Sequence, residues 1–335
     1  MNRSQTDLLR ILSAVAIVFN HTLWESFIQF PSTTESILVA LINQAGKGAV
    51  LFFIYLSGFA FSRHPHLQNP FPWQRFYRSR LGRIGPLYLL SSLIFYFWKN
   101  PIGSLPEVLL LGSAHFHLYF LALILYLYLL FPLLRQLPSS GPLTIIFFIM
   151  VLILLAIGFF LEGETTAVYG WFLYAGYGLF FFQLGIWGGQ GKFSIPARFA
   201  PLLLLFSFAL LWVDFVIRAD SGMPVDHAGR VWRPSVALFT LAAMAMIRRV
   251  PLWDTDLKQP ARATFLVYVI HPFFMEGVST WEPGIRFVLV LLTSFAAAWL
   301  LSSLGRRFRF IGLIFGEGDH LLAERNLQGG PDKKL

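Results

Sequence analysis

The stretch RILSAVAIVFNH, residues 10–21, places two ionisable side chains on one face of an apolar helix. Eleven residues turn an α-helix by roughly 1100°, three full turns plus about 20°, and advance it by about 16 Å. Arg10 and His21 therefore share one stripe, and Glu25, one turn further on, continues it. Ionisable groups in hydrocarbon are costly and usually functional, so this stripe indicates chemistry if the segment crosses a membrane.

The composition of the whole chain indicates that this segment crosses a membrane. Of 335 residues, 56% are hydrophobic and 13% are charged, and apolar runs long enough to cross a bilayer recur throughout. No small-x-small cleavage site follows the first run, so we expect it to be retained rather than removed as a signal peptide. The pattern predicts an all-α integral membrane protein with about ten transmembrane helices, at residues 8–28, 40–61, 84–98, 115–134, 142–161, 168–188, 200–217, 234–247, 263–281 and 285–304.

The basic residues predict the orientation of these spans. With ten crossings and a cytoplasmic N-terminus, the cytoplasmic side holds 20 of the 26 lysines and arginines, five lie outside, and Lys47 lies within a span. The inverted arrangement would break the positive-inside rule at nearly every loop. Both termini are therefore expected in the cytoplasm, and the net charge of +9 reflects topology rather than nucleic-acid binding.

The chain is predicted to form one multi-pass membrane domain, residues 1–305, followed by a cytoplasmic tail, residues 306–335, that is partly disordered. We expect residues 62–83 to form a cytoplasmic loop and residues 99–114 to lie along the outer interface. The absence of cysteine excludes disulfides, a cysteine nucleophile and thiolate metal ligands. No span carries histidines or glutamates at metal-ligand spacing, so no metal site is predicted.

A second basic cluster lies at the start of the third span, in RLGRIGPLY, residues 80–88. Arg80 and Arg83 are three residues apart and share a helix face, and each guanidinium can bind a phosphate through two hydrogen bonds. They are candidates for binding a phosphorylated cytoplasmic ligand. The alternative, with about equal weight, is that they only set the topology and contact lipid phosphates.

Other polar residues in or near spans have competing interpretations. His117 opens the fourth span at its outer end, where histidines are commonly packing residues. His271 precedes Pro272, which frees a backbone carbonyl one turn back, and a buried histidine that binds this carbonyl is a serious structural alternative. Ser57 and Gly58 are as readily a helix contact as a site.

The external loop 218–233 is the most polar on its side and contains Asp226 and Trp232. Carbohydrates are bound by planar polar groups together with an aromatic face, so this loop is a candidate for carbohydrate binding. A solvated loop that only joins two spans is about as probable.

The chain resembles the acyltransferase-3 family of polytopic membrane acyltransferases. Single short apolar matches are weak, but six in the right order are specific. They are the Arg-x10-His spacing of Arg10 and His21, GKGAVLFFIYLSGF (46–59), RLGRIGPLY (80–88), HLYFLALILYLYLLFPLL (117–134, with Tyr119 where tryptophan is usual), FFFQLGIWGG (180–189) and FLVYVIHPFF (265–274).

The resemblance implies an O-acyltransferase of a bacterial cytoplasmic (inner) membrane. Such an enzyme moves an acyl group, usually acetyl, from cytoplasmic acyl-coenzyme A to a carbohydrate hydroxyl. The acceptor would be a surface polysaccharide or a lipid-linked glycan. Only about 30 residues follow the tenth span, so the chain is similar to members without an appended esterase domain, and some of those transfer succinyl.

Residue chemistry and resemblance together predict the roles. Arg10, Arg80 and Arg83 would bind the phosphates of acyl-CoA, and His21 would act as a base or accept the acyl group. Spacing alone suggests that Glu25 orients His21. We expect His117, Asp226 and Trp232 to bind the acceptor.

Two other classes of protein are compatible with these observations. A proton-coupled transporter of a small anion or glycan precursor would also use intramembrane ionisable groups, but it would be expected to show paired, broken spans. A non-catalytic scaffold would not need the histidine and the arginines at these positions.

Overall fold

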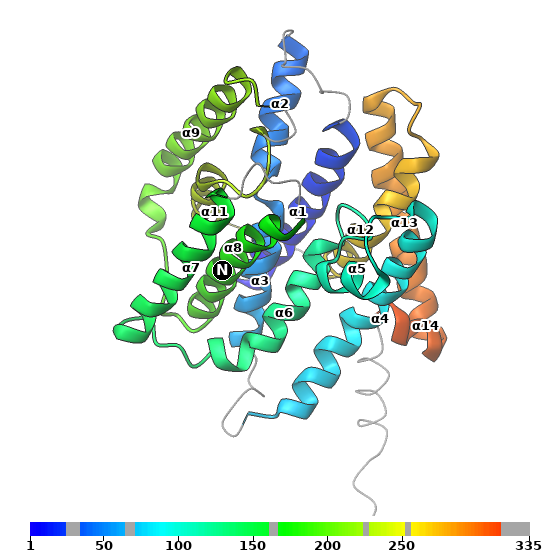
Figure 1. Cartoon of the computed structure of the whole chain (residues 1–335), viewed down its shortest axis with the longest axis horizontal. Coiled ribbons are helices and arrows are strands. Elements are labelled where there is room, and N and C mark those ends of the chain that lie inside the picture. Colours follow the sequence, from blue (N-terminus) through cyan, green and yellow to red (C-terminus); the bar gives the residue numbers. More distant parts are fainter. Residues whose placement is uncertain (25–33, 64–70, 161–166, 224–227, 252–255, 316–335) are drawn as a thin grey trace, which may run out of the picture.

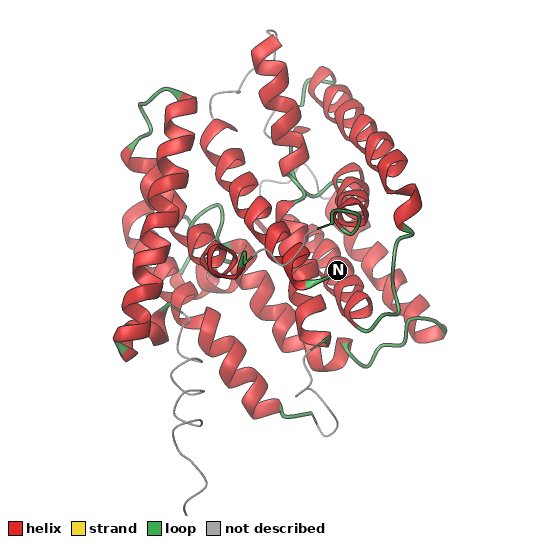
Figure 2. Cartoon of the chain, turned by 180° about the vertical axis from the view of Figure 1, so that it is seen from behind, coloured by secondary structure: helices red, strands yellow, loops and turns green. Residues whose placement is uncertain are grey.

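The computed structural model describes the whole chain except residues 25–33, 64–70, 161–166, 224–227, 252–255 and 316–335 (Figure 1). The described part consists of helices and connecting loops, with no strand (Figure 2). The described elements of the N-terminal half are α1 (Arg3–Trp24), α2 (Thr34–Gly46), α3 (Ala49–Ser62), α4 (Trp73–Lys99), α5 (Leu105–Leu111), α6 (Tyr119–Leu134) and α7 (Pro142–Phe160). The remaining elements are α8 (Ala167–Gly189), the 3₁₀ turn Ala197–Phe199, α9 (Ala200–Asp220), α11 (Pro234–Ile247), α12 (Lys258–Gly277), α13 (Pro283–Arg307) and α14 (Arg309–Ile314).

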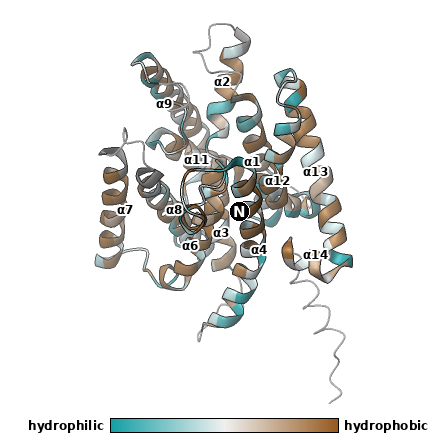
Figure 3. Cartoon of the chain, turned by 45° about the vertical axis from the view of Figure 1, so that its right-hand side comes forward, coloured by the Kyte–Doolittle hydropathy of each residue, from teal (hydrophilic) through white to brown (hydrophobic). Residues whose placement is uncertain are grey.

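The all-helical membrane class predicted from the composition is confirmed. Within the described residues, five helical segments are long and apolar enough to cross a bilayer, and three shorter apolar helices accompany them. Large apolar side chains are exposed along α7, α9 and α13, as expected for surfaces that face lipid. The ribbons of these helices carry many hydrophobic residues (Figure 3). Each of the ten predicted ranges overlaps a helix, whereas the number of crossings and the cytoplasmic termini stay predictions.

The second predicted span is not one continuous helix. It is divided into α2 and α3 at Lys47 and Gly48. A side chain at Gly48 would meet the Thr240 hydroxyl of α11 at 2.5 Å from its Cβ. The break therefore lies at a close approach of α11, where a larger residue at position 48 would require the Thr240 side chain to shift.

The helix of the third predicted span, α4, begins earlier than predicted. We expected residues 62–83 to form a loop, but α4 starts at Trp73, so its first three turns carry Arg75, Arg78, Arg80 and Arg83. Phe76 is buried in this segment and stacks on Phe131 of α6, 5.1 Å between ring centroids. This tertiary packing stabilises a helical start whose basic composition suggested a loop.

Helix α1 occupies the centre of the arrangement. It packs against α2, α3, α12 and α13, and Leu9, Ala14 and Val18 are buried at these contacts. At the other end of the chain α13 extends to Arg307, and α14 packs back against α13 and α4. The first part of the predicted tail is thus helical, and residues 316–335 lie outside the described part.

Candidate active site

Two histidines from opposite ends of the chain form the centre of the site. His21 lies near the C-terminal end of α1, and His271 lies on α12, which packs against α1. The Nδ1 atom of His21 is 2.8 Å from the Nε2 atom of His271. The two rings are nearly parallel, with 5.1 Å between centroids and 18° between planes. His271 is fully buried and His21 is partly exposed, so of these two residues only His21 is in part accessible from the surface.

Pro272 explains how His271 is held. Proline has no N–H, so the carbonyl group of Tyr268, four residues earlier, lacks its helical donor. The Nδ1 atom of His271 lies 2.8 Å from this carbonyl oxygen and 3.2 Å from that of Val267. The structural alternative stated for His271 from the sequence is therefore confirmed. The hydrogen bond at Nδ1 leaves Nε2 of the same ring facing His21.

Two further histidines extend the cluster from the turns before α6. The ring centroid of His117 is 5.6 Å from that of His271, and the Nδ1 atoms of His115 and His117 are 2.9 Å apart. The hydroxyl of Tyr268 donates a hydrogen bond to the carbonyl oxygen of His117. The structure thus places His117 beside the histidine pair, although its predicted role in acceptor binding stays a prediction.

The end of α1 that carries His21 is held from two sides. The guanidinium of Arg286, buried on α13, donates a hydrogen bond to the carbonyl oxygen of Thr22. Phe116 contacts the His21 ring edge-on, with 4.7 Å between centroids. These contacts restrict the orientation of the imidazole. Glu25, predicted to orient it as well, lies outside the described residues.

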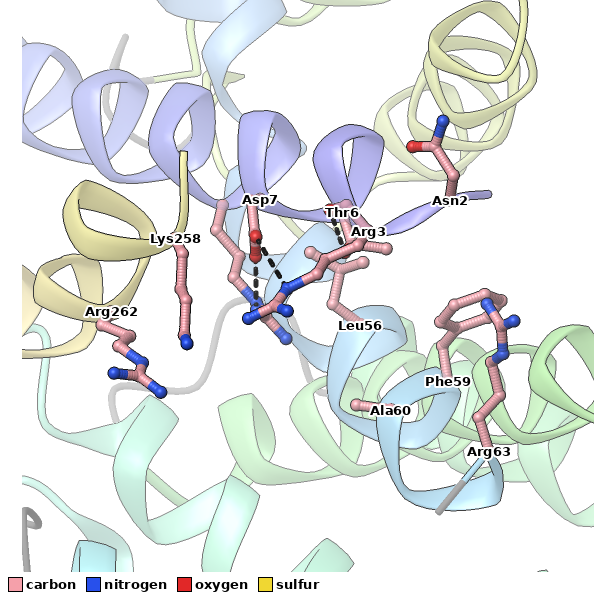
Figure 4. Close-up of a pocket in the computed structure, with 11 residues that line it drawn as sticks. Asn2, Arg3, Thr6, Asp7, Leu56, Phe59, Ala60, Arg63, Lys258 and Arg262 are labelled. Carbon is pink, nitrogen blue, oxygen red and sulfur yellow. Dashed lines mark hydrogen bonds and ion pairs between the residues drawn. The ribbon is translucent and has the colours of Figure 1, made fainter. Parts of the chain in front are cut away.

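The opposite end of α1 borders a cationic cavity of about 530 Å³. Lys258 and Arg262 of α12 border it on one side and Arg63 on the other (Figure 4). Its other polar lining residues are Asn2, Arg3, Thr6, Asp7 and Arg10. Five cations thus surround one carboxylate, and that carboxylate accepts a hydrogen bond of 2.9 Å from the Arg10 guanidinium. The excess positive charge suits a ligand with more than one anionic group.

Arg80 and Arg83 do not line this cavity, but they lie close to Arg10. The Arg80 guanidinium stacks over the Phe61 ring, 4.8 Å from its centroid. Arg83 is within electrostatic reach of Arg10, and all three arginines are within reach of the Tyr128 hydroxyl. Arg10 therefore lies between the cavity and the second basic cluster, which brings the three predicted donor-binding residues together.

The described part of the external loop has a packing role. Trp232 is 5% exposed and contacts the rings of Tyr119, Tyr174 and Tyr177. The neighbouring Arg233 is buried too, so this half of the loop joins helices rather than facing solvent. The role of Trp232 in acceptor binding stays a prediction that its burial does not favour. Asp226 lies outside the described residues.

Sequence reasoning did not assign a functional role to His115 or His271, or to Arg63, Lys258 and Arg262 of the cavity. The only local signal was Pro272, which favoured a structural role for His271. The cavity cations come from α12 and from the residue that follows α3. No spacing rule relates such distant segments of a chain.

A helical membrane protein whose central helix α1 joins a histidine cluster at one end and borders a cationic cavity at the other defines a class of multi-pass membrane protein with ionisable groups in its interior. The model of the acyltransferase-3 family, described as an acyltransferase domain, matches residues 4–303. The chain belongs to this family, and it is a membrane acyltransferase. No curated protein and no solved structure is significantly similar to it.

Proposed function

We propose that this acyltransferase moves an acyl group, in the first instance acetyl, from cytoplasmic acyl-CoA to a hydroxyl of a cell-surface carbohydrate, and that it does so in a bacterial inner membrane. The observation that carries the proposal is the arrangement along α1. Arg10 borders the cationic cavity, and His21 joins the histidine cluster eleven residues further along the same helix, about 16 Å away along its axis.

The shape of the donor supports this arrangement. Coenzyme A carries its phosphates at one end and its thioester at the end of a long, uncharged pantetheine arm. The phosphates would bind the cations around Arg10, including Arg80 and Arg83. The arm would then follow α1 and present the thioester to His21.

The chemistry requires one unprotonated ring nitrogen. In direct transfer, His21 takes the proton of the sugar hydroxyl, the sugar oxygen bonds to the acyl carbon, and the C–S bond breaks. The proton then passes from His21 to the coenzyme A thiolate. If His21 is instead acylated first, the same nitrogen attacks the thioester carbon and the C–S bond breaks to release coenzyme A thiolate. The sugar hydroxyl then attacks the acyl carbon, the bond between the acyl carbon and the nitrogen breaks, and the hydroxyl proton passes to the thiolate.

The test is an acyl-transfer assay on the purified protein in lipid nanodiscs. Labelled acetyl-CoA is supplied with glycan extracts, and covalent label and thiol release are measured together. Because the chain contains no cysteine, a thiol reagent detects only released coenzyme A. We expect His21→Ala to lower the rate by about 10²–10⁴-fold, with unchanged donor binding and thermal stability.

His320→Ala is the matched control, since His320 lies outside the residues that match the family. It should retain the wild-type rate. A near wild-type rate in His21→Ala would show that His21 is a packing residue. Uptake of substrate into vesicles without any covalent product would favour the transporter instead.

A further inference from the structure

We infer that His271 is a positioning residue that fixes the tautomer of His21 and thereby makes Nε2 of His21 the reactive nitrogen. The inference rests on the proposed function for its kinetic consequence. Its structural part follows from which atoms can donate and which can only accept hydrogen bonds.

The assignment starts at the kink made by Pro272. The two oxygen atoms within 2.8 Å and 3.2 Å of His271 Nδ1 are backbone carbonyls, those of Tyr268 and Val267. Carbonyl oxygens only accept hydrogen bonds. The Nδ1 atom of His271 therefore carries a hydrogen.

The second step follows from the chemistry of imidazole. A neutral ring carries one N–H, so its other nitrogen is an acceptor. With its hydrogen on Nδ1, His271 offers a lone pair at Nε2, and that atom is 2.8 Å from Nδ1 of His21. The Nδ1 atom of His21 must then donate, which leaves the lone pair of His21 on Nε2.

The same contacts stabilise the charged intermediate. When Nε2 of His21 takes a proton, the ring becomes an imidazolium whose Nδ1–H already donates to His271. The N–H of His271 in turn points at two carbonyl dipoles. Positive charge formed on His21 is thereby shared with a buried, prearranged hydrogen-bond chain.

Two substitutions test the hydrogen bonds of the two ring nitrogens of His271 one at a time. Asparagine places its amide near Nδ1, so His271→Asn keeps a donor to the Tyr268 carbonyl but removes the acceptor for His21. Glutamine reaches the Nε2 position, so His271→Gln keeps an acceptor for His21 but leaves the carbonyl without a donor. The inference predicts opposite effects of these variants on catalysis and on stability.

We expect His271→Asn to retain the wild-type melting temperature and donor KM while kcat falls about 10²-fold or more. We expect His271→Gln to melt at a lower temperature. Assayed below that temperature, its kcat should stay within about tenfold of wild type. A merely structural role predicts that activity follows stability in both variants. That result, or a wild-type kcat in His271→Asn, would overturn the inference.

A second readout does not depend on acyl transfer. Nitrogen-15 NMR of the histidine-labelled protein distinguishes Nδ1–H from Nε2–H rings. We expect Nδ1–H signals for His21 and His271, assigned by their loss in His21→Ala and His271→Gln. An Nε2–H signal for His21 would refute the inference directly. Nδ1–H signals in a protein without acyl transfer would instead refute only the proposed function.

Discussion

Arg10 has a different environment on each side. Toward the N-terminus it is paired with Asp7 and borders the cavity that Lys258 and Arg262 also line. Toward α4 it is within electrostatic reach of Arg83. The proposed donor, acyl-CoA, carries phosphate in two places, a diphosphate and a ribose phosphate, so two neighbouring groups of cations would match its charge distribution better than one.

Replacing one cation in either group should weaken donor binding. Loss of a charge-assisted hydrogen bond to phosphate costs about 1.5–3 kcal/mol, so Arg80→Ala, Arg83→Ala and Arg262→Ala should each lower affinity roughly tenfold or more. Titration of a non-hydrolysable acyl-CoA analogue measures this directly. Arg249→Ala is the control, because Arg249 is exposed and does not line the cavity.

If Arg80→Ala and Arg83→Ala bind the analogue as tightly as Arg249→Ala does, the second cluster is only a topology signal. If Arg262→Ala alone weakens binding, the donor phosphates occupy the cavity and do not reach α4.

At the scale of elements, the closest contact joins α3 and α8. A Cβ atom at Gly58 would lie 2.3 Å from the carbonyl oxygen of Phe182, and one at Gly185 would lie 2.1 Å from that of Tyr55. Both obstacles are backbone atoms, which cannot rotate away. The small-residue interpretation of the Ser57–Gly58 pair is thus confirmed for Gly58.

Alanine at this contact should force the two helices apart. We expect Gly185→Ala to destabilise the protein by about 1–3 kcal/mol, the usual cost of overpacking, and to lower the melting temperature in detergent. Gly82→Ala is the matched control, since nothing outside the local helix backbone lies within 4 Å of its Cβ position in α4. It should be neutral or stabilising. Equal melting temperatures for the two variants would contradict the close contact.

Helix α13 begins with a carboxylate cap. The side chain of Glu282 accepts hydrogen bonds of 3.0 Å and 2.9 Å from the backbone N–H groups of Gly284 and Ile285. These two bonds lower the pKa of Glu282 below its ordinary value of 4.5. The cap therefore favours the ionised form in the folded state.

A lowered folded-state pKa means that the cap contributes fully above about pH 4.5 and that its contribution is lost as the pH falls through the lower, folded value. We expect Glu282→Gln to lower the melting temperature at neutral pH and to make little difference at the acidic end. Melting curves of the two proteins from pH 7 to pH 3 test this. A constant difference at all pH values would show that the carboxylate charge contributes nothing.

At the scale of the whole molecule, exposed apolar surfaces and basic residues predict how the helices cross the bilayer. Large apolar side chains are exposed on helices of the outer surface, including Leu143, Leu202 and Leu292. The positive-inside rule predicts that the cavity around Arg10 opens to the cytoplasm and that the loop after α9 lies outside.

The absence of cysteine makes this topology directly testable, because the wild-type chain is already a cysteine-free background. We expect Ser221→Cys and Thr280→Cys to react with a membrane-impermeant maleimide in intact spheroplasts. Ser139→Cys should react only after permeabilisation. All three positions are exposed. Labelling of Ser139→Cys from outside would reverse the orientation and place the cationic cavity away from cytoplasmic donors.

The sequence by itself determined the features that depend on local properties of the chain. Apolar length and composition placed a helix at each of the ten predicted ranges. The 3.6-residue period placed Arg10 and His21 on one face of α1, and the missing N–H of Pro272 predicted the hydrogen bond made by His271. The break at Gly48 and the start of α4 at Trp73 escaped prediction, and both occur at tertiary contacts, a close approach of α11 and a stacking contact with α6, that local sequence does not encode.

Only the tertiary structure decided which side chains meet. His21 and His271 are 250 residues apart, the cavity joins cations from several segments, and Trp232 is buried among tyrosines rather than exposed on a loop. The helical period predicts which residues share a face of one helix, but it does not predict which faces of different helices pack together. That choice depends on how the apolar surfaces and small residues of all the helices fit at once, so contacts between distant segments emerge only from the packed molecule.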